Sequence, residues 1–211
     1  MKVAFRFNGY DRRRELVPVR EEKDIVSPYY CVAHAGRYYL LACQEKRREA
    51  GPERRMSIWR IDLMTELEIP GRTERCNGER VLKKREVENL PQEWDETFPL
   101  THLNMSFDKP IPITLRLVNL WPGRDGGTWM NYTFLMDWFG SSFRYERTET
   151  EPPYGDIVRV MCSPFGMVNW ALQYSDRVEV LEPKEVREAL EEKIIKLNRK
   201  YGIEGNPEAR D

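Results

Sequence analysis

The chain begins with a clear alternation of apolar and polar residues. Over residues 2–8, Val3, Phe5 and Phe7 alternate with polar or small side chains, a period of two that is typical of a strand with one buried face. Two later runs are separated by Ala35-Gly36, which predicts a β-hairpin. The strands predicted after the first one cover residues 29–34, 37–43, 57–63 and 65–69. So many short strands within residues 1–71 predict a small β-barrel.

The second half of the chain mixes strand and helix patterns. Residues 72–110 are rich in Arg and Glu and predict a connector, with about two turns of helix over 84–90 that end at Pro91. Beyond the connector we expect strands at 113–118, 143–146, 157–161 and 178–181, and helices at 132–139 and 167–174. This order, β-α-β-β-α-β, is that of the ferredoxin-like fold. The predicted class is therefore α+β, with a barrel over 1–71, a connector over 72–110 and a ferredoxin-like domain over 111–205.

The last predicted element is an amphipathic helix that starts at Pro183 and ends at Gly202. Its apolar residues recur every three or four positions and form one stripe, which consists of Val186, Leu190, Ile194, Leu197 and Tyr201. Such a stripe usually packs against its own domain. The alternative is a contact between two copies of the chain, and we expect a homodimer.

The overall charge of the chain identifies no partner. The 211 residues carry a formal net charge of -1, which excludes a uniformly basic nucleic-acid binder. The charge is unevenly distributed, however, because residues 1–60 hold 14 Lys and Arg against 8 Asp and Glu. A local anion-binding surface is therefore expected in the first sixty residues.

Several classes of site are absent from the sequence pattern. The four cysteines are far apart and no C-x-x-C pair occurs, so we expect free thiols, no metal site and no cofactor. No apolar run is long enough to span a membrane, which favours a cytoplasmic protein. His34 lies beside a predicted turn, but no orienting partner is apparent for a catalytic base. With no catalytic motif either, we expect that the chain is not an enzyme.

The basic first segment contains arginines interleaved with aromatic residues. Arg20 precedes the predicted hairpin, Arg37 lies at its turn and Arg60 lies in a later strand, near Tyr29, Tyr39 and Trp59. Guanidinium groups bind phosphates through two hydrogen bonds, and aromatic rings stack on bases. This combination is therefore typical of nucleic-acid binding. The alternative is an ordinary solvated sheet face, on which the arginines pair with Glu21, Glu22 and Asp62.

Several short motifs resemble one known family. The motifs are Ser27-Pro28-Tyr29-Tyr30, Gly36-Arg37-Tyr38-Tyr39-Leu40, Trp59-Arg60-Ile61-Asp62-Leu63-Met64, Asn169-Trp170-Ala171-Leu172 and Asp176-Arg177-Val178-Glu179-Val180-Leu181-Glu182-Pro183. Together they resemble the WYL-domain family of bacterial transcriptional regulators and its C-terminal extension. Tyr38-Tyr39-Leu40 stands where the family has Trp-Tyr-Leu, and Leu63 stands at a position that is basic in the family.

The resemblance implies an architecture and a function. Family members are similar to an SH3/Sm-like β-barrel followed by a ferredoxin-like extension, and they act as sensors that bind a nucleic acid or nucleotide and adjust a helix-turn-helix DNA-binding domain. No helix-turn-helix pattern occurs here, so that domain is expected on a longer or a separate chain, unless the chain is a stand-alone WYL protein. The implied ligand contacts are Arg37, Tyr39, Arg60, Arg20, Tyr29, His34 and Asp62. A pure oligomerisation or protein-interaction module and a small-molecule sensor remain alternatives.

Overall fold

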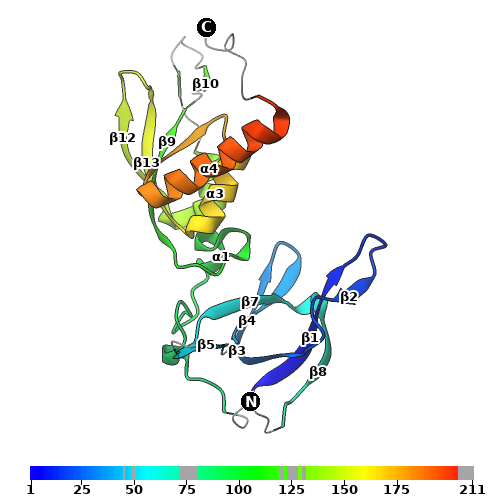
Figure 1. Ribbon diagram of the computed structural model, residues 1–211. Coiled ribbons are helices and arrows are strands. Elements are labelled where there is room, and N and C mark those ends of the chain that lie inside the picture. The colour runs from blue at the N-terminus through cyan, green and yellow to red at the C-terminus, as the bar shows by residue number, and fades with distance from the viewer. Residues whose placement is uncertain are drawn as a thin grey trace. The chain divides into compact units, whose positions relative to one another are not determined.

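In the computed structural model the chain forms two compact units, Met1–Glu96 and Thr97–Asp211. The structure describes residues 1–44, 46–48, 51–71, 80–118, 121–122, 128–129 and 132–203. Each unit is built on an antiparallel sheet (Figure 1). The α+β class predicted from the sequence is confirmed. Within the described ranges, no helix is both long and apolar enough to cross a membrane.

The first unit is a six-stranded sheet that curls into a half-barrel (Figure 1). The sheet runs in the order β2-β1-β3-β4-β7. Strand β8 also pairs with β1, on the side opposite to β3. All of these pairings are antiparallel. The bounds are β1 (Val3–Tyr10), β2 (Leu16–Pro18), β3 (Asp24–His34), β4 (Arg37–Cys43), β7 (Met56–Arg60) and β8 (Met64–Glu68). Strands β5 (Lys46–Arg48) and β6 (Gly51–Glu53) form a separate two-stranded sheet.

The hairpin predicted at Ala35-Gly36 is confirmed. His34 and Arg37 are directly paired across β3 and β4, and the two residues between them have φ values of 48° and 73°. Positive φ at both central positions matches the right-handed twist of the flanking strands. The strand predicted over 57–63 ends earlier than expected, at Arg60, because a 3₁₀ turn over Ile61–Leu63 leads the chain directly into β8.

One face of the curled sheet holds a small aromatic core. Its buried members are Phe5, Val26, Leu40, Ala42 and Trp59. The Phe5 and Trp59 rings meet edge to face with centroids 5.2 Å apart, a favoured geometry for aromatic pairs. Leu40 and Ala42 point into this core, so the alternate residues of β4 face the opposite side of the sheet.

Residues 80–94, here called the cover segment, complete the first unit. Leu82, Val87 and Leu90 are at most 6% exposed. The amide of Leu82 donates to Ser27 Oγ at 3.2 Å, and Ser27 is paired with Cys43 of β4. A core residue of this segment therefore lies beside the end of β4 at which both Leu41 and Cys43 are buried.

The helix predicted over 84–90 is wrong. Only a 3₁₀ turn forms, over Lys84–Glu86. The backbone of Glu88 instead bonds to the strand edge, since its amide donates to Arg54 O at 2.8 Å and its carbonyl accepts from Met56 N at 2.9 Å. These bonds satisfy the backbone groups that a helix would have paired internally.

The second unit has a four-stranded antiparallel sheet in the order β12-β13-β9-β14. Its strands are β9 (Ile111–Leu117), β12 (Arg144–Glu149), β13 (Gly155–Cys162) and β14 (Val178–Glu182), and its longer helices are α2 (Thr133–Phe139), α3 (Pro164–Gln173) and α4 (Lys184–Tyr201). The short elements are α1 (Phe98–Thr101), β10 (Trp121–Pro122), β11 (Thr128–Trp129) and 3₁₀ turns at Leu103–Met105 and Gly140–Ser142. Along the chain, the four-stranded sheet and the longer helices follow the predicted order of strand, helix, strand, strand, helix, strand, then the terminal helix.

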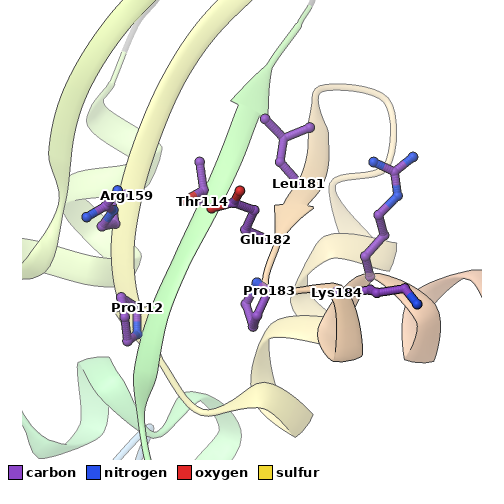
Figure 2. Close-up of a pocket in the computed structure, with 8 residues that line it drawn as sticks. Pro112, Thr114, Arg159, Leu181, Glu182, Pro183 and Lys184 are labelled. Carbon is purple, nitrogen blue, oxygen red and sulfur yellow. The ribbon is translucent and has the colours of Figure 1, made fainter.

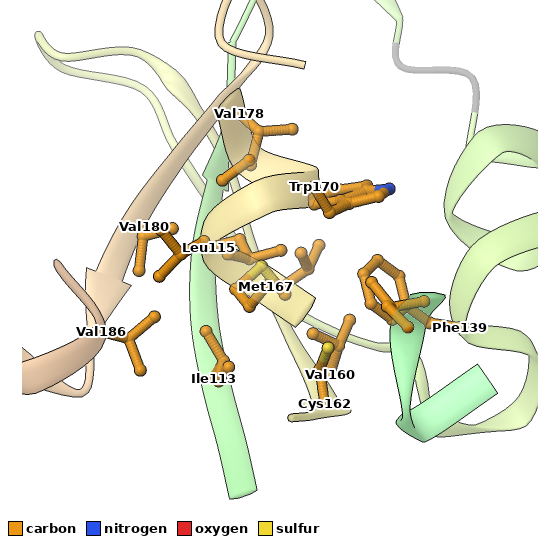
Figure 3. Close-up of a cluster of buried hydrophobic side chains, with 14 of the residues drawn as sticks. Ile113, Leu115, Phe139, Val160, Cys162, Met167, Trp170, Val178, Val180 and Val186 are labelled. Atoms are coloured by element: carbon orange, nitrogen blue, oxygen red, sulfur yellow. The ribbon is translucent and has the colours of Figure 1, made fainter. Parts of the chain in front are cut away.

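The core of the second unit lies between one face of this sheet and the helices (Figure 3). Alternate residues of three strands contribute, for example Ile113, Val160 and Val180. Trp170 of α3 and Phe139 of α2 pack edge to face with ring centroids 4.8 Å apart. Because the core residues alternate along the strands, their neighbours form a second face of the sheet.

That second face is largely charged. Arg116 of β9 donates from Nε to Glu149 Oε2 at 3.0 Å and from Nη1 to Glu179, so that strands on either side of β9 are joined through it. The guanidinium side chain is only 13% exposed. Strand β12, at one edge of the sheet, carries four charged residues among its six and has a register shift between Tyr145 and Arg147.

The cover segment provides a stability prediction. Leu82→Ala is expected to lower the free energy of unfolding of the first unit by about 2–5 kcal/mol, because it removes buried methyl groups and leaves a cavity. Urea unfolding followed by tryptophan fluorescence measures this change. The exposed neighbour variant Lys83→Ala is the control and should change stability by no more than about 0.5 kcal/mol. Equal, small effects of the two variants would contradict a core role for the segment.

Candidate ligand-binding surface of the first unit

Three of the predicted contacts lie together on neighbouring strands. Tyr39 of β4 is directly paired with Arg60 of β7, which places both side chains on the same face of the sheet. Arg37 lies two residues before Tyr39 and therefore shares this face. Asp62 follows in the 3₁₀ turn after β7. We call Arg37, Tyr39, Arg60 and Asp62 the β4–β7 surface.

Arg60 and Asp62 form a two-bonded ion pair. Arg60 Nε donates to Asp62 Oδ1 at 3.1 Å, and Nη2 donates to Oδ2. The hydrogen bonds between the two side chains lower the pKa of Asp62 and raise the pKa of Arg60. Both side chains are accessible, with 30% of Arg60 and 45% of Asp62 exposed. The guanidinium group is thus held in one orientation at the surface.

Arg37 adds a second positive charge to the same place. Its charge also contributes to lowering the pKa of Asp62. Arg37 is exposed, and in the described part of the chain no carboxylate lies within ion-pair distance of it. Two arginines therefore flank one carboxylate on the β4–β7 surface. His34, half-buried at the end of β3, is the strand partner of Arg37.

Arg20 is held at a different point. Its Nε lies 3.2 Å from Oδ2 of Asp24, a fully buried carboxylate that also accepts from Gln44 Nε2 at 2.6 Å. Its guanidinium carbon lies 6.0 Å from the centre of the Trp59 ring, which belongs to the core face. Among the described residues, no hydrogen bond or ion pair joins Arg20 to the β4–β7 surface.

Tyr29 makes a contact that the sequence did not predict. Its hydroxyl donates to the carbonyl of Leu82 at 3.0 Å, and the hydroxyl of the next residue, Tyr30, donates to Pro91 O at 3.1 Å. Lys84 Nζ in turn donates to the Tyr30 hydroxyl at 2.6 Å. The two tyrosines fasten the cover segment to β3.

The Leu63 position explains one departure from the resemblance. Leu63 is 8% exposed, and its carbonyl accepts from Asn8 Nδ2 at 3.0 Å. A buried position of this kind suits an apolar side chain and not a solvated cation. The β4–β7 surface therefore has no basic side chain at this position.

The second unit has a pocket that the sequence did not predict (Figure 2), and its lining includes Arg159, Lys184 and Arg187. Arg159 is the one charged residue in the apolar run Ile157–Met161, which was a usable signal. Lys184 and Arg187 fall within an ordinary charged helix, where nothing in the pattern distinguishes them. No cluster of three or more His, Cys, Asp or Glu suited to a metal was found in the residues that the structure describes.

Comparisons with known proteins do not assign the chain to a family. No protein-family model and no curated protein matches it. A solved structure described as a CRISPR Cas-related protein is 16% identical, with 97% of this chain and 48% of that chain covered and a TM-score of 0.44. The proteasome accessory factor B/C (PafBC) of Arthrobacter aurescens is 18% identical, with 95% and 25% covered and a TM-score of 0.31. This chain thus spans about half of the first protein and a quarter of the second.

Tyr29 provides a prediction about pH. Burial is the main cause that raises the pKa of Tyr29 from 10.0 to about 12. The folded state therefore favours the neutral phenol, and this contribution to stability is present below pH 10 and lost as the pH rises towards about 12. Tyr29→Phe should cost about 1 kcal/mol near neutral pH, and the cost should disappear over this window.

Urea unfolding of the wild type and of Tyr29→Phe at several pH values measures the difference. Tyr38→Phe, which removes the hydroxyl of a residue of β4 that is 66% exposed, is the control. A cost for Tyr29→Phe that stays constant up to about pH 12 would contradict the assignment.

Proposed function

We propose that this chain is the non-enzymatic ligand-sensing module of a WYL-type transcriptional regulator. In this proposal the β4–β7 surface binds the phosphates of a single-stranded nucleic acid or a nucleotide. Binding then modulates a helix-turn-helix DNA-binding domain, either attached or on a partner chain. The observation that supports it most is the direct pairing of Tyr39 with Arg60, with Arg37 on the same face.

The Arg60–Asp62 pair is suited to exchange with a ligand. Exposed ion pairs of this kind contribute only about 0.2–1 kcal/mol to stability. A phosphate presents the same two-oxygen edge to a guanidinium group as a carboxylate does. Asp62 therefore keeps Arg60 oriented in the free protein and can be displaced by a phosphate, while Tyr39 offers a ring for a base to stack on.

Two features of the fold are in line with the WYL assignment. In the first unit, a single 3₁₀ turn links β7 to β8, and β8 closes back onto β1, which we interpret as an SH3/Sm-like barrel. In the second unit, the sheet order β12-β13-β9-β14 with crossings through α2 and α3 is the arrangement that we interpret as the ferredoxin-like extension.

The first prediction of this proposal concerns single-stranded nucleic acid. Arg37→Ala and Arg60→Ala should each weaken binding of a labelled single-stranded oligonucleotide about tenfold or more, because each removes one charge-assisted phosphate contact. Each variant should also reduce the slope of log K against log salt by about one. Fluorescence anisotropy across a salt series, with both DNA and RNA, measures both quantities.

The matched control is Arg85→Ala, which removes an exposed arginine from the cover segment of the same unit. Its affinity and salt slope should stay close to those of the wild type. Wild-type affinity in both Arg37→Ala and Arg60→Ala, with the protein still folded, would refute the nucleic-acid proposal. Binding of small molecules without oligonucleotide binding would favour the small-molecule sensor.

A second candidate function is assembly of two copies through α4. The first part of its apolar stripe is buried in its own unit, with Val186 2% and Leu190 9% exposed. The later part is accessible, since Ile194 is 41% and Tyr201 69% exposed. The stripe therefore serves its own core and also presents apolar area to solvent, which favours a contact with a second copy.

If α4 mediates assembly, Ile194→Asp and Tyr201→Asp should convert a dimer into a monomer, because each introduces a charge into the apolar contact. Light scattering after size exclusion measures the mass. These substitutions leave Val186 and Leu190 in place, so the core of the second unit is preserved. A monomeric wild type, or a dimer that persists in both variants, would count against assembly through α4.

A further inference from the structure

A pocket of about 610 Å³ lies in the second unit, between the charged face of the sheet and the first turn of α4 (Figure 2). Its polar lining consists of Thr114, Arg159, Glu182, Lys184 and Arg187, and two prolines and a leucine complete the wall. The volume lies within the range of about 300–1,000 Å³ typical of small-molecule sites. We call it the α4 pocket.

Sheet register fixes the floor of the α4 pocket. Thr114 of β9 is paired on one side with Arg159 of β13 and on the other with Glu182 of β14. These three residues form a row across the sheet, and Thr114 at its centre is 9% exposed. The register shift between Val180 and Glu182 brings Glu182 into this row.

The cations of the α4 pocket lie at two ends. Arg159 comes from β13 and Lys184 from α4 beyond β14, and Glu182 lies between these two (Figure 2). Arg187 also belongs to the first turn of α4. Strands β13 and β14 are separated by β9, which places them about 10 Å apart. A ligand that satisfies both ends is therefore elongated, with an anionic group at each end and a hydrogen-bond donor in the middle for Glu182.

The ion pairs that these cations make are accessible to exchange. Each cation lies close to a glutamate outside the pocket lining, and the distances are 2.8 Å for Arg159–Glu146, 3.1 Å for Lys184–Glu188 and 3.0 Å for Arg187–Glu191. In all three pairs the cation is at least 46% exposed. Such exposed pairs yield readily to a more highly charged group such as a phosphate.

We propose that the α4 pocket binds a small molecule with two phosphate groups separated by a hydroxyl-bearing sugar. Arg159 holds one phosphate, Lys184 and Arg187 hold the other, and Glu182 accepts a hydrogen bond from a sugar hydroxyl. This site lies in the second unit and does not depend on the β4–β7 surface. The sugar can belong to a sugar bisphosphate or to a nucleoside with phosphates on two ribose positions, since both offer the same chemistry.

Isothermal titration of the full chain tests this proposal. The probes are fructose bisphosphate, which has a phosphate at each end, an adenosine bisphosphate with phosphates on two ribose positions, and fructose monophosphate. We expect the monophosphate to bind at least about tenfold more weakly than one of the bisphosphates, because it engages only one end of the pocket. The tighter of the two bisphosphates identifies the kind of sugar.

The variants Arg159→Gln and Lys184→Gln separate the two ends. Each should weaken the preferred bisphosphate about tenfold or more, and Arg159→Gln should remove most of the difference between bisphosphate and monophosphate. The matched control is Lys196→Gln. Lys196 lies in the same helix but outside the pocket, and like Lys184 it is paired with a glutamate four residues away. It should bind as the wild type does.

Three results would overturn the proposal. One is the absence of binding by both bisphosphates at millimolar concentration, and another is equal affinity for bisphosphate and monophosphate in the wild type. The third is binding that persists in Arg159→Gln and Lys184→Gln but is lost in Arg60→Ala, which would place the ligand on the first unit. Loss of oligonucleotide binding in Arg60→Ala with retained bisphosphate binding would support two separate sites.

Discussion

Strand β4 is buried on both faces at one end and open at the other, and the rest of the first unit depends on this difference. Leu41 and Cys43 are nearly inaccessible although they face away from the aromatic core, whereas Arg37 is exposed. The cover segment, fastened by the hydroxyls of Tyr29 and Tyr30, supplies the second layer at the buried end. The charged end is therefore presented by a strand that is anchored in a core, which holds the β4–β7 surface more firmly than a loop would.

The periodicity of the sequence predicted most strands of the two sheets, but not β2, the first half of β3 or the segments that cover the sheets. A period of two assigns residues of β4 to two faces without saying which face is buried, and both proved to be buried near Cys43. The apolar residues responsible, Leu82, Val87 and Leu90, are scattered through an Arg/Glu-rich segment that was interpreted as a connector. The segment that carries them is bonded to β3 and to the start of β7, and no local pattern contains such long-range contacts.

The candidate surface could be predicted only in part, because some of its residues are placed by strand pairing and others by long-range contacts. Tyr39 and Arg60 meet because their strands are neighbours in a fixed register, and the resemblance of the motifs anticipated the pair. Arg20 does not join this pair, because its buried partner Asp24 decides where it lies. The α4 pocket could not be predicted from the sequence, because its two charged ends, on β13 and α4, are brought together by a strand order that differs from the chain order.

Strand β12, at one edge of the four-stranded sheet, has a consequence for the protein in a crowded solution. A sheet edge with unpaired amides and carbonyls is a template on which any extended chain can add a strand, which is the first step of aggregation. The alternating charges of β12 and the irregular pairing after Tyr145 make this edge costly to extend. The sheet can thus keep charged side chains exposed on one face without recruiting copies of itself at the β12 edge.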